Sequence, residues 1–326
     1  MKPPSPKHDS RDVAVGTWMG FTAAVAYAIA IMVLRHLADR ESISRAVWVS
    51  CVKAVPAAVV AFAMGLSSKR WGTRFFPPAK FSLMILASGL FMQFGSNVGF
   101  QWSLSRTGMA VTVPVSYASM LLLSAWMGKR QLGEHISLRA ALSMGLLIVA
   151  IALLSGGAAN ARSDIRSLTS PVLFLSIGAA LIAGAGWAWT GVVIRQAVTS
   201  GVSVAATIFL FSMSGVVGLG LTTIGVSGWY HPKFTTPHEF GWMFLAGAFN
   251  ALAFFMLTAA LQRITVVRTN LINASQIAMT TTAGVVLFQE RGTVFLLFGT
   301  FLTIVGLFVM GSAKTEVPPS KNAVDA

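Results

Sequence analysis

Residues 23–35 read AAVAYAIAIMVLR, and residues 183–195 read AGAGWAWTGVVIR. Four residues agree between the two stretches: Ala23, Ala28, Val33 and Arg35 in the first are matched by Ala183, Ala188, Val193 and Arg195 in the second. Two tripeptide pairs match at a similar offset, Leu104-Ser-Arg106 with Leu261-Gln-Arg263 and Leu132-Gly-Glu134 with Phe288-Gln-Glu290. The offset stays between 156 and 160 residues in all three places, which indicates an internal duplication.

Long apolar blocks make up each copy. The 326 residues are 55% hydrophobic and 10% charged, whereas a soluble domain carries about 25% charged residues. A block of about twenty residues can cross a ~30 Å hydrocarbon layer as a helix, which satisfies every backbone polar group in lipid. The sequence predicts an all-α integral membrane protein with ten transmembrane helices, at residues 13–36, 44–66, 80–103, 108–128, 136–156, 170–195, 202–226, 239–261, 266–288 and 293–312.

The duplication divides these spans into two repeats of five helices. Residues 13–157 form the first predicted repeat, residues 158–169 an inter-repeat loop and residues 170–312 the second repeat; the polar tails are residues 1–12 and 313–326. Because five is odd, the second repeat must enter the membrane inverted relative to the first. Inverted repeats are typical of carriers that bind substrate in a central cavity and work by alternating access.

The distribution of Lys and Arg predicts the orientation. With both termini cytoplasmic, fifteen of the 24 basic residues lie in inner segments and eight in outer ones, and Lys53 lies inside a span. An excess of basic residues on the inner side is the usual rule for membrane proteins. The basic residues sit at the ends of apolar blocks and form no single face, so the net charge of +14 does not predict nucleic acid as a partner.

Lys53 is the charged residue that lies deepest in a predicted span. It is about ten residues from either end, or roughly 14 Å deep at 1.5 Å per residue. A lipid-facing Lys at this depth costs about 2.5–3.5 kcal/mol, so the side chain should face the bundle interior, either charged in a water-filled cavity or neutral. We expect it to bind an anionic group of the substrate or to take part in proton coupling. The structural alternative is a Lys that donates to backbone carbonyls beside Pro56.

Polar side chains recur at helical spacing in several spans. Gln93, Asn97 and Gln101 follow an i, i+4, i+8 pattern in the third span, and the repeat offset matches Gln93 with Asn250 and Gln101 with Thr258 in the eighth. Such a stripe either lines a cavity or makes interhelical hydrogen bonds. We predict that the three side chains of the stripe and Asn250 contact substrate.

The ninth predicted span is the most polar, with Asn270, Asn273 and Gln276 at every third position. These amides are expected to contact substrate, opposite a wall in the fourth span made of Ser116, Tyr117 and Ser124. Trp187 occupies the position equivalent to Tyr27 in the other repeat. The two rings are predicted either to flank the ligand or to pack as ordinary aromatic residues.

Charged residues near the span ends have a structural interpretation. Glu134 and Glu290 are expected at the N-termini of the fifth and tenth helices, where the helix dipole favours a carboxylate by about 0.3–1 kcal/mol. Arg35 and Arg195 close the first and sixth helices for the opposite reason. A role for either glutamate as proton carrier is the alternative.

These features together resemble the EamA-type branch of the drug/metabolite transporter superfamily. The matching residues are Arg106-Thr-Gly-Met-Ala110, Pro114, Gly133-Glu134, Thr265, Asn270 and Gln289-Glu290. The resemblance covers residues 13–312 and implies secondary transport, usually export, of a small metabolite through a cavity lined by both halves. Pro114 has no counterpart in the ninth span, where Leu271 stands, so the two halves should bend differently at that depth.

We therefore expect a secondary transporter, an exporter, of a small polar or anionic metabolite such as an amino acid or organic acid. Nucleotide sugars, sugars and hydrophobic cations are alternative substrates, and a coupling proton is a candidate partner. A channel is less favoured because no filter segment or charge ring is evident, and an enzyme because no HExxH motif, intramembrane aspartate pair or intramembrane histidine occurs. No cofactor or metal is expected, and the location expected is the bilayer of a bacterial inner membrane.

Overall fold

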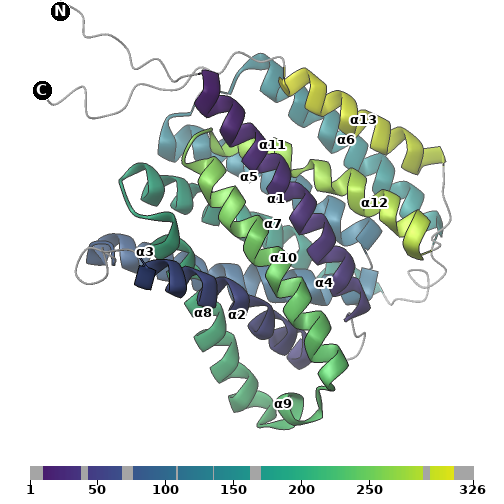
Figure 1. The fold of residues 1–326 in the computed structure, drawn as a ribbon. Helices are drawn as coiled ribbons and strands as arrows, with labels where there is room; N and C mark the ends of the chain where they lie inside the picture. The colour runs from purple at the N-terminus through teal and green to yellow at the C-terminus, as the bar shows by residue number, and fades with distance from the viewer. Residues whose placement is uncertain are drawn as a thin grey trace, which may run out of the picture.

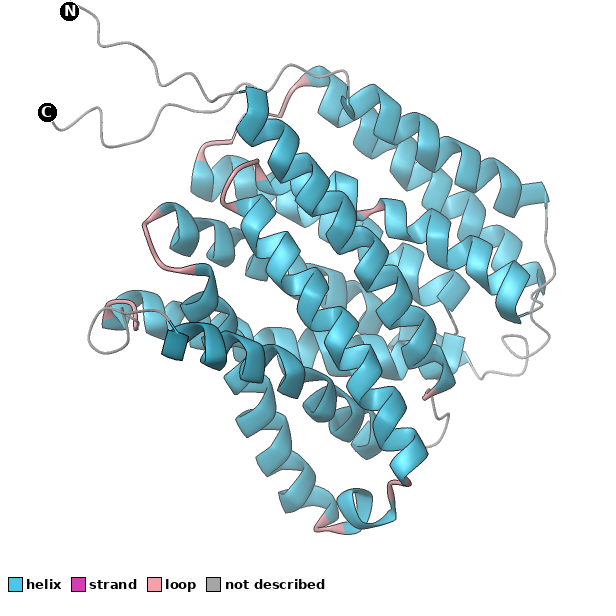
Figure 2. Cartoon of the chain, viewed as in Figure 1, coloured by secondary structure: helices cyan, strands magenta, loops and turns pink. Residues whose placement is uncertain are grey.

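The computed structural model describes residues 10–37, 43–67, 76–107, 109–134, 136–161, 170–288 and 294–311. Within these ranges the chain forms helices joined by short turns and contains no strand (Figure 2). The α-helices are α1 (Ser10–His36), α2 (Ile43–Ser67), α3 (Ala79–Phe91), α4 (Gly99–Thr107), α5 (Met109–Leu132), α6 (Leu138–Ala161), α7 (Ser170–Thr199), α8 (Val204–Ser227), α9 (Tyr230–Phe234), α10 (Pro237–Leu261), α11 (Val266–Asn273), α12 (Ser275–Phe288) and α13 (Val294–Gly311). A π-helix, η1 (Met92–Val98), lies between α3 and α4.

Seven stretches of the described chain are long and apolar enough to cross a membrane. They are Arg11–Arg35, Ile43–Leu66, Ala79–Thr107, Val111–Leu132, Pro171–Thr199, Val204–Ser227 and Pro237–Leu261. Leu138–Ala150 is a shorter apolar helix. The chain thus carries multiple membrane-type helices, and the predicted count of ten spans stays a prediction.

The predicted element bounds differ from the structure at several ends. α1 begins at Ser10, inside the predicted tail 1–12, and α6 extends to Ala161, past the predicted loop start at residue 158. The short helix α9 was not predicted. The rest of the predicted loop 158–169 from residue 162 on, the tail 313–326, Gly108 and Gln289-Glu290 lie outside the described residues.

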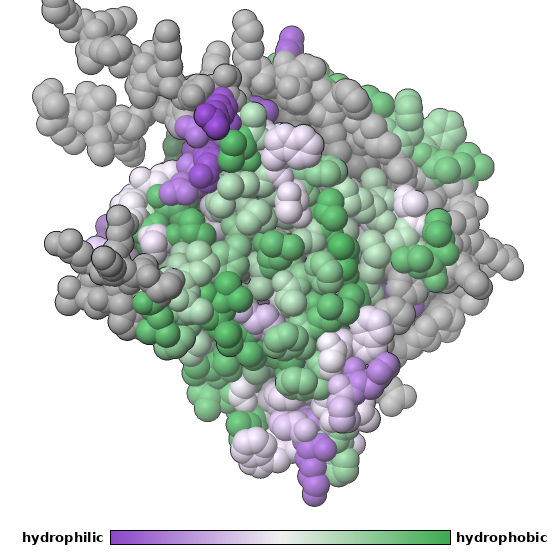
Figure 3. Space-filling model, in the orientation of Figure 1, coloured by the Kyte–Doolittle hydropathy of each residue, from purple (hydrophilic) through white to green (hydrophobic). Residues whose placement is uncertain are grey.

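Helices from distant parts of the sequence pack in pairs. α1 and α10 run side by side across the front of Figure 1, and α6 and α13 lie together at its upper right. α2 packs against α8 and α10, while α5 packs against α7. On the face shown in Figure 3, apolar side chains cover most of the middle, and strongly polar ones gather at the upper left and at the bottom, near α9. This pattern fits a bundle whose middle faces lipid.

Hydroxyl side chains start several helices in the second half of the chain. Ser203 caps α8, Thr236 caps α10 and Thr265 caps α11, each by accepting a hydrogen bond from a backbone amide of the first turn. At α10 the glutamate Glu239 bonds back to the amide of Thr236, and Pro237 occupies the first helical position. These caps satisfy donors that would otherwise be unpaired near the membrane.

Two predicted spans are helical but not uniform. In the third, η1 has a wider turn than an α-helix, and the side chains of Gln93 and Asn97 within it still lie close enough to bond. In the ninth, α11 ends at Asn273 and α12 begins at Ser275. At this break the amide of Ile277 bonds to the carbonyl of Ala274 (3.0 Å), one residue later than in an α-helix. The carbonyl of Asn273 therefore becomes available to a side chain.

Candidate functional site

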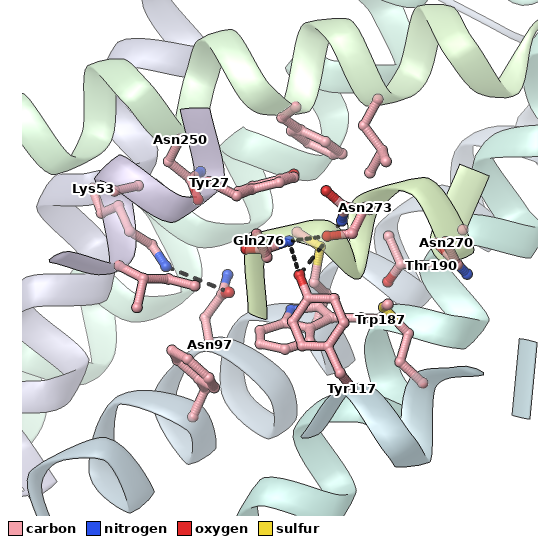
Figure 4. Close-up of a pocket in the computed structure, with 18 of the residues that line it drawn as sticks. Tyr27, Lys53, Asn97, Tyr117, Trp187, Thr190, Asn250, Asn270, Asn273 and Gln276 are labelled. Carbon is pink, nitrogen blue, oxygen red and sulfur yellow. Dashed lines mark hydrogen bonds between the residues drawn. The ribbon is translucent and has the colours of Figure 1, made fainter. Parts of the chain in front are cut away.

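A cavity lies among α1, α2, η1, α4, α5, α7, α10, α11 and α12 (Figure 4). It holds about 850 Å³ of empty space, including the part that opens to the outside. Its polar wall consists of Tyr27, Lys53, Asn97, Tyr117, Thr190, Asn250, Asn270, Asn273 and Gln276. The remaining wall is apolar or aromatic and includes Ile31, Leu34, Met92, Phe100, Met120, Trp187, Ile194, Phe254 and Leu257. A largely apolar cavity with a few converging polar groups is the usual form of a small-molecule site.

Lys53 reaches the cavity from α2 and is 6% exposed. Its ammonium donates to the Asn97 Oδ1 atom at 3.5 Å, a long hydrogen bond, and Figure 4 shows the two side chains pointing toward each other. The structural alternative, donation to a backbone carbonyl beside Pro56, is not seen. The described cavity wall contains no Asp or Glu. A buried cation without an acidic partner in that wall is suited to an anionic ligand group.

Asn97 is held in place by a chain of amide hydrogen bonds. Its Nδ2 atom donates to the Gln93 Oε1 atom at 2.7 Å, and the Gln93 Nε2 atom donates to the carbonyl of Phe211 in α8 at 3.2 Å. This chain orients the Asn97 oxygen toward Lys53. Gln93 thus supports the site from behind the wall.

A second polar group comes from the break in the ninth span. The Nε2 atom of Gln276 donates to the hydroxyl of Tyr117 and, at 3.0 Å, to the carbonyl of Asn273 freed at the break. The Asn273 Nδ2 atom also donates to the Tyr117 hydroxyl, at 3.4 Å. The side-chain oxygens of Asn273 and Gln276 are buried and have no hydrogen-bond partner among the described residues. These two oxygens can accept hydrogen bonds from a ligand.

Aromatic rings cover the side of the cavity next to Tyr117. The Trp187 ring centroid lies 5.1 Å from that of Phe100 and 6.3 Å from that of Tyr117. Tyr27 lies opposite, in α1 (Figure 4). Both rings line the cavity, and Trp187 also packs against Phe100 and Tyr117; that the two rings flank a ligand stays a prediction.

The structure brings most of the predicted site residues to one cavity. Its wall includes Lys53, Asn97, Tyr117, Trp187, Asn250, Asn270, Asn273 and Gln276. Gln93 and Gln101 are buried but absent from that wall, and so are Ser116 and Ser124. Gln101 lies in α4, after the π-helical turn that contains Gln93 and Asn97. Thr190 was missed, although its position three residues after Trp187 places it on the same face of α7.

Two charged residues next to the cavity bond to the ends of helices that do not contain them. Glu134 precedes α6, and its carboxylate accepts hydrogen bonds from the amide of Val266, the first residue of α11, at 3.0 and 3.2 Å. Arg195 donates to the carbonyls of Leu261, where α10 ends, and Ile264, the latter at 2.7 Å. The Arg195 Nε atom lies 3.8 Å from Glu134 Oε1. Burial raises the pKa of Glu134, while the Val266 amide and Arg195 oppose that rise. The expected dipole interaction therefore exists but involves α10 and α11.

Comparison with known proteins supports the expected resemblance. Residues 174–312 match the EamA-like transporter family. This range starts within α7 and runs through α13, so it covers the second predicted repeat. A solved crystal structure aligns with a TM-score of 0.70 at 16% sequence identity, over 91% of this chain and 96% of that chain. At this identity the alignment shows a shared fold alone. No curated protein sequence matches the chain.

Proposed function

Since residues 174–312 form an EamA-like transporter domain, consistent with the drug/metabolite transporter superfamily, we propose that the chain is a secondary transporter working by alternating access. Its substrate is a small anionic or polar metabolite, such as an amino acid or organic acid, and its direction is export. The central cavity is the binding site, and the bilayer is the inner membrane of a bacterium, with both termini cytoplasmic.

The observation that carries the proposal is the position of Lys53. A cation that is 6% exposed, and whose one hydrogen bond is a long contact to a neutral amide, keeps most of its bonding capacity for a ligand. A carboxylate placed there would form a charge-assisted hydrogen bond, which is roughly twice as strong as a neutral one. A hydrophobic cation would instead meet an unfavourable charge.

The wall opposite Lys53 narrows the chemical class of the substrate further. The free oxygens of Asn273 and Gln276 accept hydrogen bonds but donate none, so they suit an ammonium or hydroxyl group. A substrate that carries a carboxylate at one end and a donor group at the other satisfies both walls. Amino acids and hydroxy acids have this arrangement.

Helix packing supports two repeats related by a two-fold axis, and the odd number of predicted spans in each repeat is what makes them inverted. Suppose that α1 is equivalent to α7, and α10 to the α3–η1–α4 segment. Exchanging the repeats then replaces the α1–α10 contact with contacts between α7 and the α3–η1–α4 segment. The structure contains both sets of contacts. The contact of α5 with α7 likewise corresponds to that of α1 with α11 and α12. The pairs α2 with α8 and α6 with α13 correspond to themselves. A packing pattern that survives this exchange is what a pseudo-two-fold axis requires.

Counterflow into proteoliposomes tests the proposal, with labelled amino acids and organic acids as probes. A carrier shows saturation and accelerated exchange, whereas a channel shows neither. We expect Lys53→Met to abolish exchange of an acidic substrate without lowering expression. Lys80→Met, which removes a cation from an exposed position at the start of α3, is the control and should keep full exchange. Unchanged exchange in Lys53→Met would remove the anchor role.

A further inference from the structure

The Glu134–Arg195 pair, a buried carboxylate and a part-buried guanidinium, lies immediately beyond one end of the cavity. Arg195 directly follows the wall residue Ile194 in α7. Leu261, which accepts a hydrogen bond from Arg195, is one turn beyond the wall residue Leu257 in α10. Val266, which donates to Glu134, is one turn before the wall residue Asn270 in α11. One helical turn is about 5.4 Å, so the contacts of the pair lie about that far beyond the cavity wall and involve three helices.

α11 is a short helix that is separate from its neighbours in the chain. It has eight residues, its N-terminus is bound by Glu134, and it is separated from α12 by the break at Ala274. Backbone breaks of this kind absorb the dihedral changes of a hinge. The same helix carries Asn270 and Asn273, two of the amides in the cavity wall. Cavity and bound N-terminus are thus opposite ends of one short rigid element.

We propose that Glu134 is a positioning residue that closes one end of the cavity, and that α11 pivots about Ala274 when its bond to Glu134 breaks. The inference rests on the proposed transport function, because it assigns the closing contact of the alternating-access cycle. Glu134 belongs to the first predicted repeat, whereas Arg195 and Val266 belong to the second, so breaking the contact lets the repeats separate at this end. By the charge distribution that end is cytoplasmic.

The location of the contact also links closure to substrate. A ligand that bonds Asn270 or Asn273 pulls on α11 within two turns of the Val266 amide. A ligand that binds this wall therefore shifts the equilibrium between the formed and the broken Glu134 contact. Such a difference in affinity between two states is what a ligand-driven conformational change requires. Glu134 itself touches no substrate.

Accessibility of a cavity residue tests this closure. In a Cys51→Ser background, Thr190→Cys places a thiol on the cavity wall, and a membrane-impermeant maleimide reports its exposure from each side of a proteoliposome. Val266→Pro removes the amide donor and should leave α11 intact, because proline is well accepted at the first helical position and the φ of −64° and ψ of 156° at Thr265 suit a residue before proline. Val266→Ala keeps the amide and is the matched control for lost packing.

We expect Val266→Pro to raise the labelling rate from the cytoplasmic side roughly tenfold, the effect of losing a hydrogen bond to a charged group. Glu134→Gln should raise the rate less, because the glutamine oxygen still accepts from the Val266 amide but carries no charge. Val266→Ala should change the rate little, and so should Asp12→Asn, which makes the same kind of substitution at an exposed position of α1. Equal labelling rates in Val266→Pro and Val266→Ala would overturn the proposal, even if Glu134→Gln fails to fold. The assay needs no substrate, so it reports closure independently of transport, whereas counterflow by the unsubstituted protein tests the proposed function.

Discussion

At the scale of single residues, Tyr117 connects two walls of the cavity. Its hydroxyl accepts hydrogen bonds from Gln276 and Asn273, so Tyr117→Phe leaves buried amide donors short of an acceptor. Each such loss costs about 1–3 kcal/mol. We expect a lower melting temperature and roughly tenfold weaker substrate binding, measured by thermal shift with and without ligand. Tyr27→Phe, on the same cavity but without these partners, is the control. Equal effects of both variants would contradict this role of Tyr117.

Residues of the site could be predicted from the sequence where placing their side chains in lipid costs free energy. Lys53, Asn270, Asn273 and Gln276 are expensive in a bilayer, so they had to face protein or water, and all four line the cavity. Wall residues without that cost could not be identified from the sequence. A Thr such as Thr190 can bond within its own helix, and Met120 and Leu257 are apolar and fit lipid as well as a cavity wall. Polarity alone does not distinguish a residue that lines the cavity from one that bonds to a lining residue from behind. Gln93, which bonds to Asn97, is therefore predicted as a substrate contact although it is absent from the wall.

At the scale of elements, close approach of α5 and α7 depends on a glycine. A Cβ added at Gly184 would overlap the backbone carbonyl of Ser116 in α5. Gly184→Ala should therefore push the helices apart and lower the free energy of unfolding by about 1–3 kcal/mol. Gly178→Ala, in the same helix but with no atom within 4 Å, should be neutral or stabilise by up to about 1 kcal/mol. Denaturation in detergent measures both. Similar stability of the two variants would show that α5 and α7 do not need this approach.

The elements themselves were predictable where apolar length decided them, and not where local backbone geometry did. Helices occupy each predicted span, because about twenty apolar residues bounded by polar ones specify a helix in lipid. The π-helical turn at Met92–Val98 and the break at Ala274 have no such signature. α5, which contains Pro114, runs unbroken from Met109 to Leu132, whereas the ninth span is interrupted between Asn273 and Ser275. The two halves therefore differ in this pair of spans, and a different bend at the depth of Pro114 stays a prediction.

At the scale of the whole molecule, duplication of the sequence carried more information than any motif. Matching stretches at a constant offset implied two equivalent units, and the observed helix pairs are compatible with their exchange. Which helices pair could not be read from the sequence, since the apolar faces of the spans are alike and differ mainly in small residues. The distribution of Lys and Arg predicts the orientation of the chain in the membrane.

Opposite insertion of the two repeats can be measured directly. Ile43, 59% exposed, follows the first helix of the first repeat, and the exposed Ser200 follows the first helix of the second. In a Cys51→Ser background we expect Ile43→Cys to react with an impermeant maleimide from outside intact cells, and Ser200→Cys only after the membrane is opened. Lys129→Cys, exposed at the end of α5, should behave like Ser200→Cys because it lies in an inner segment. If Ile43→Cys and Ser200→Cys react from the same side, the repeats are parallel. The first helix of each copy would then cross the membrane in one direction, and exchange of the repeats could not move the cavity opening from one face to the other.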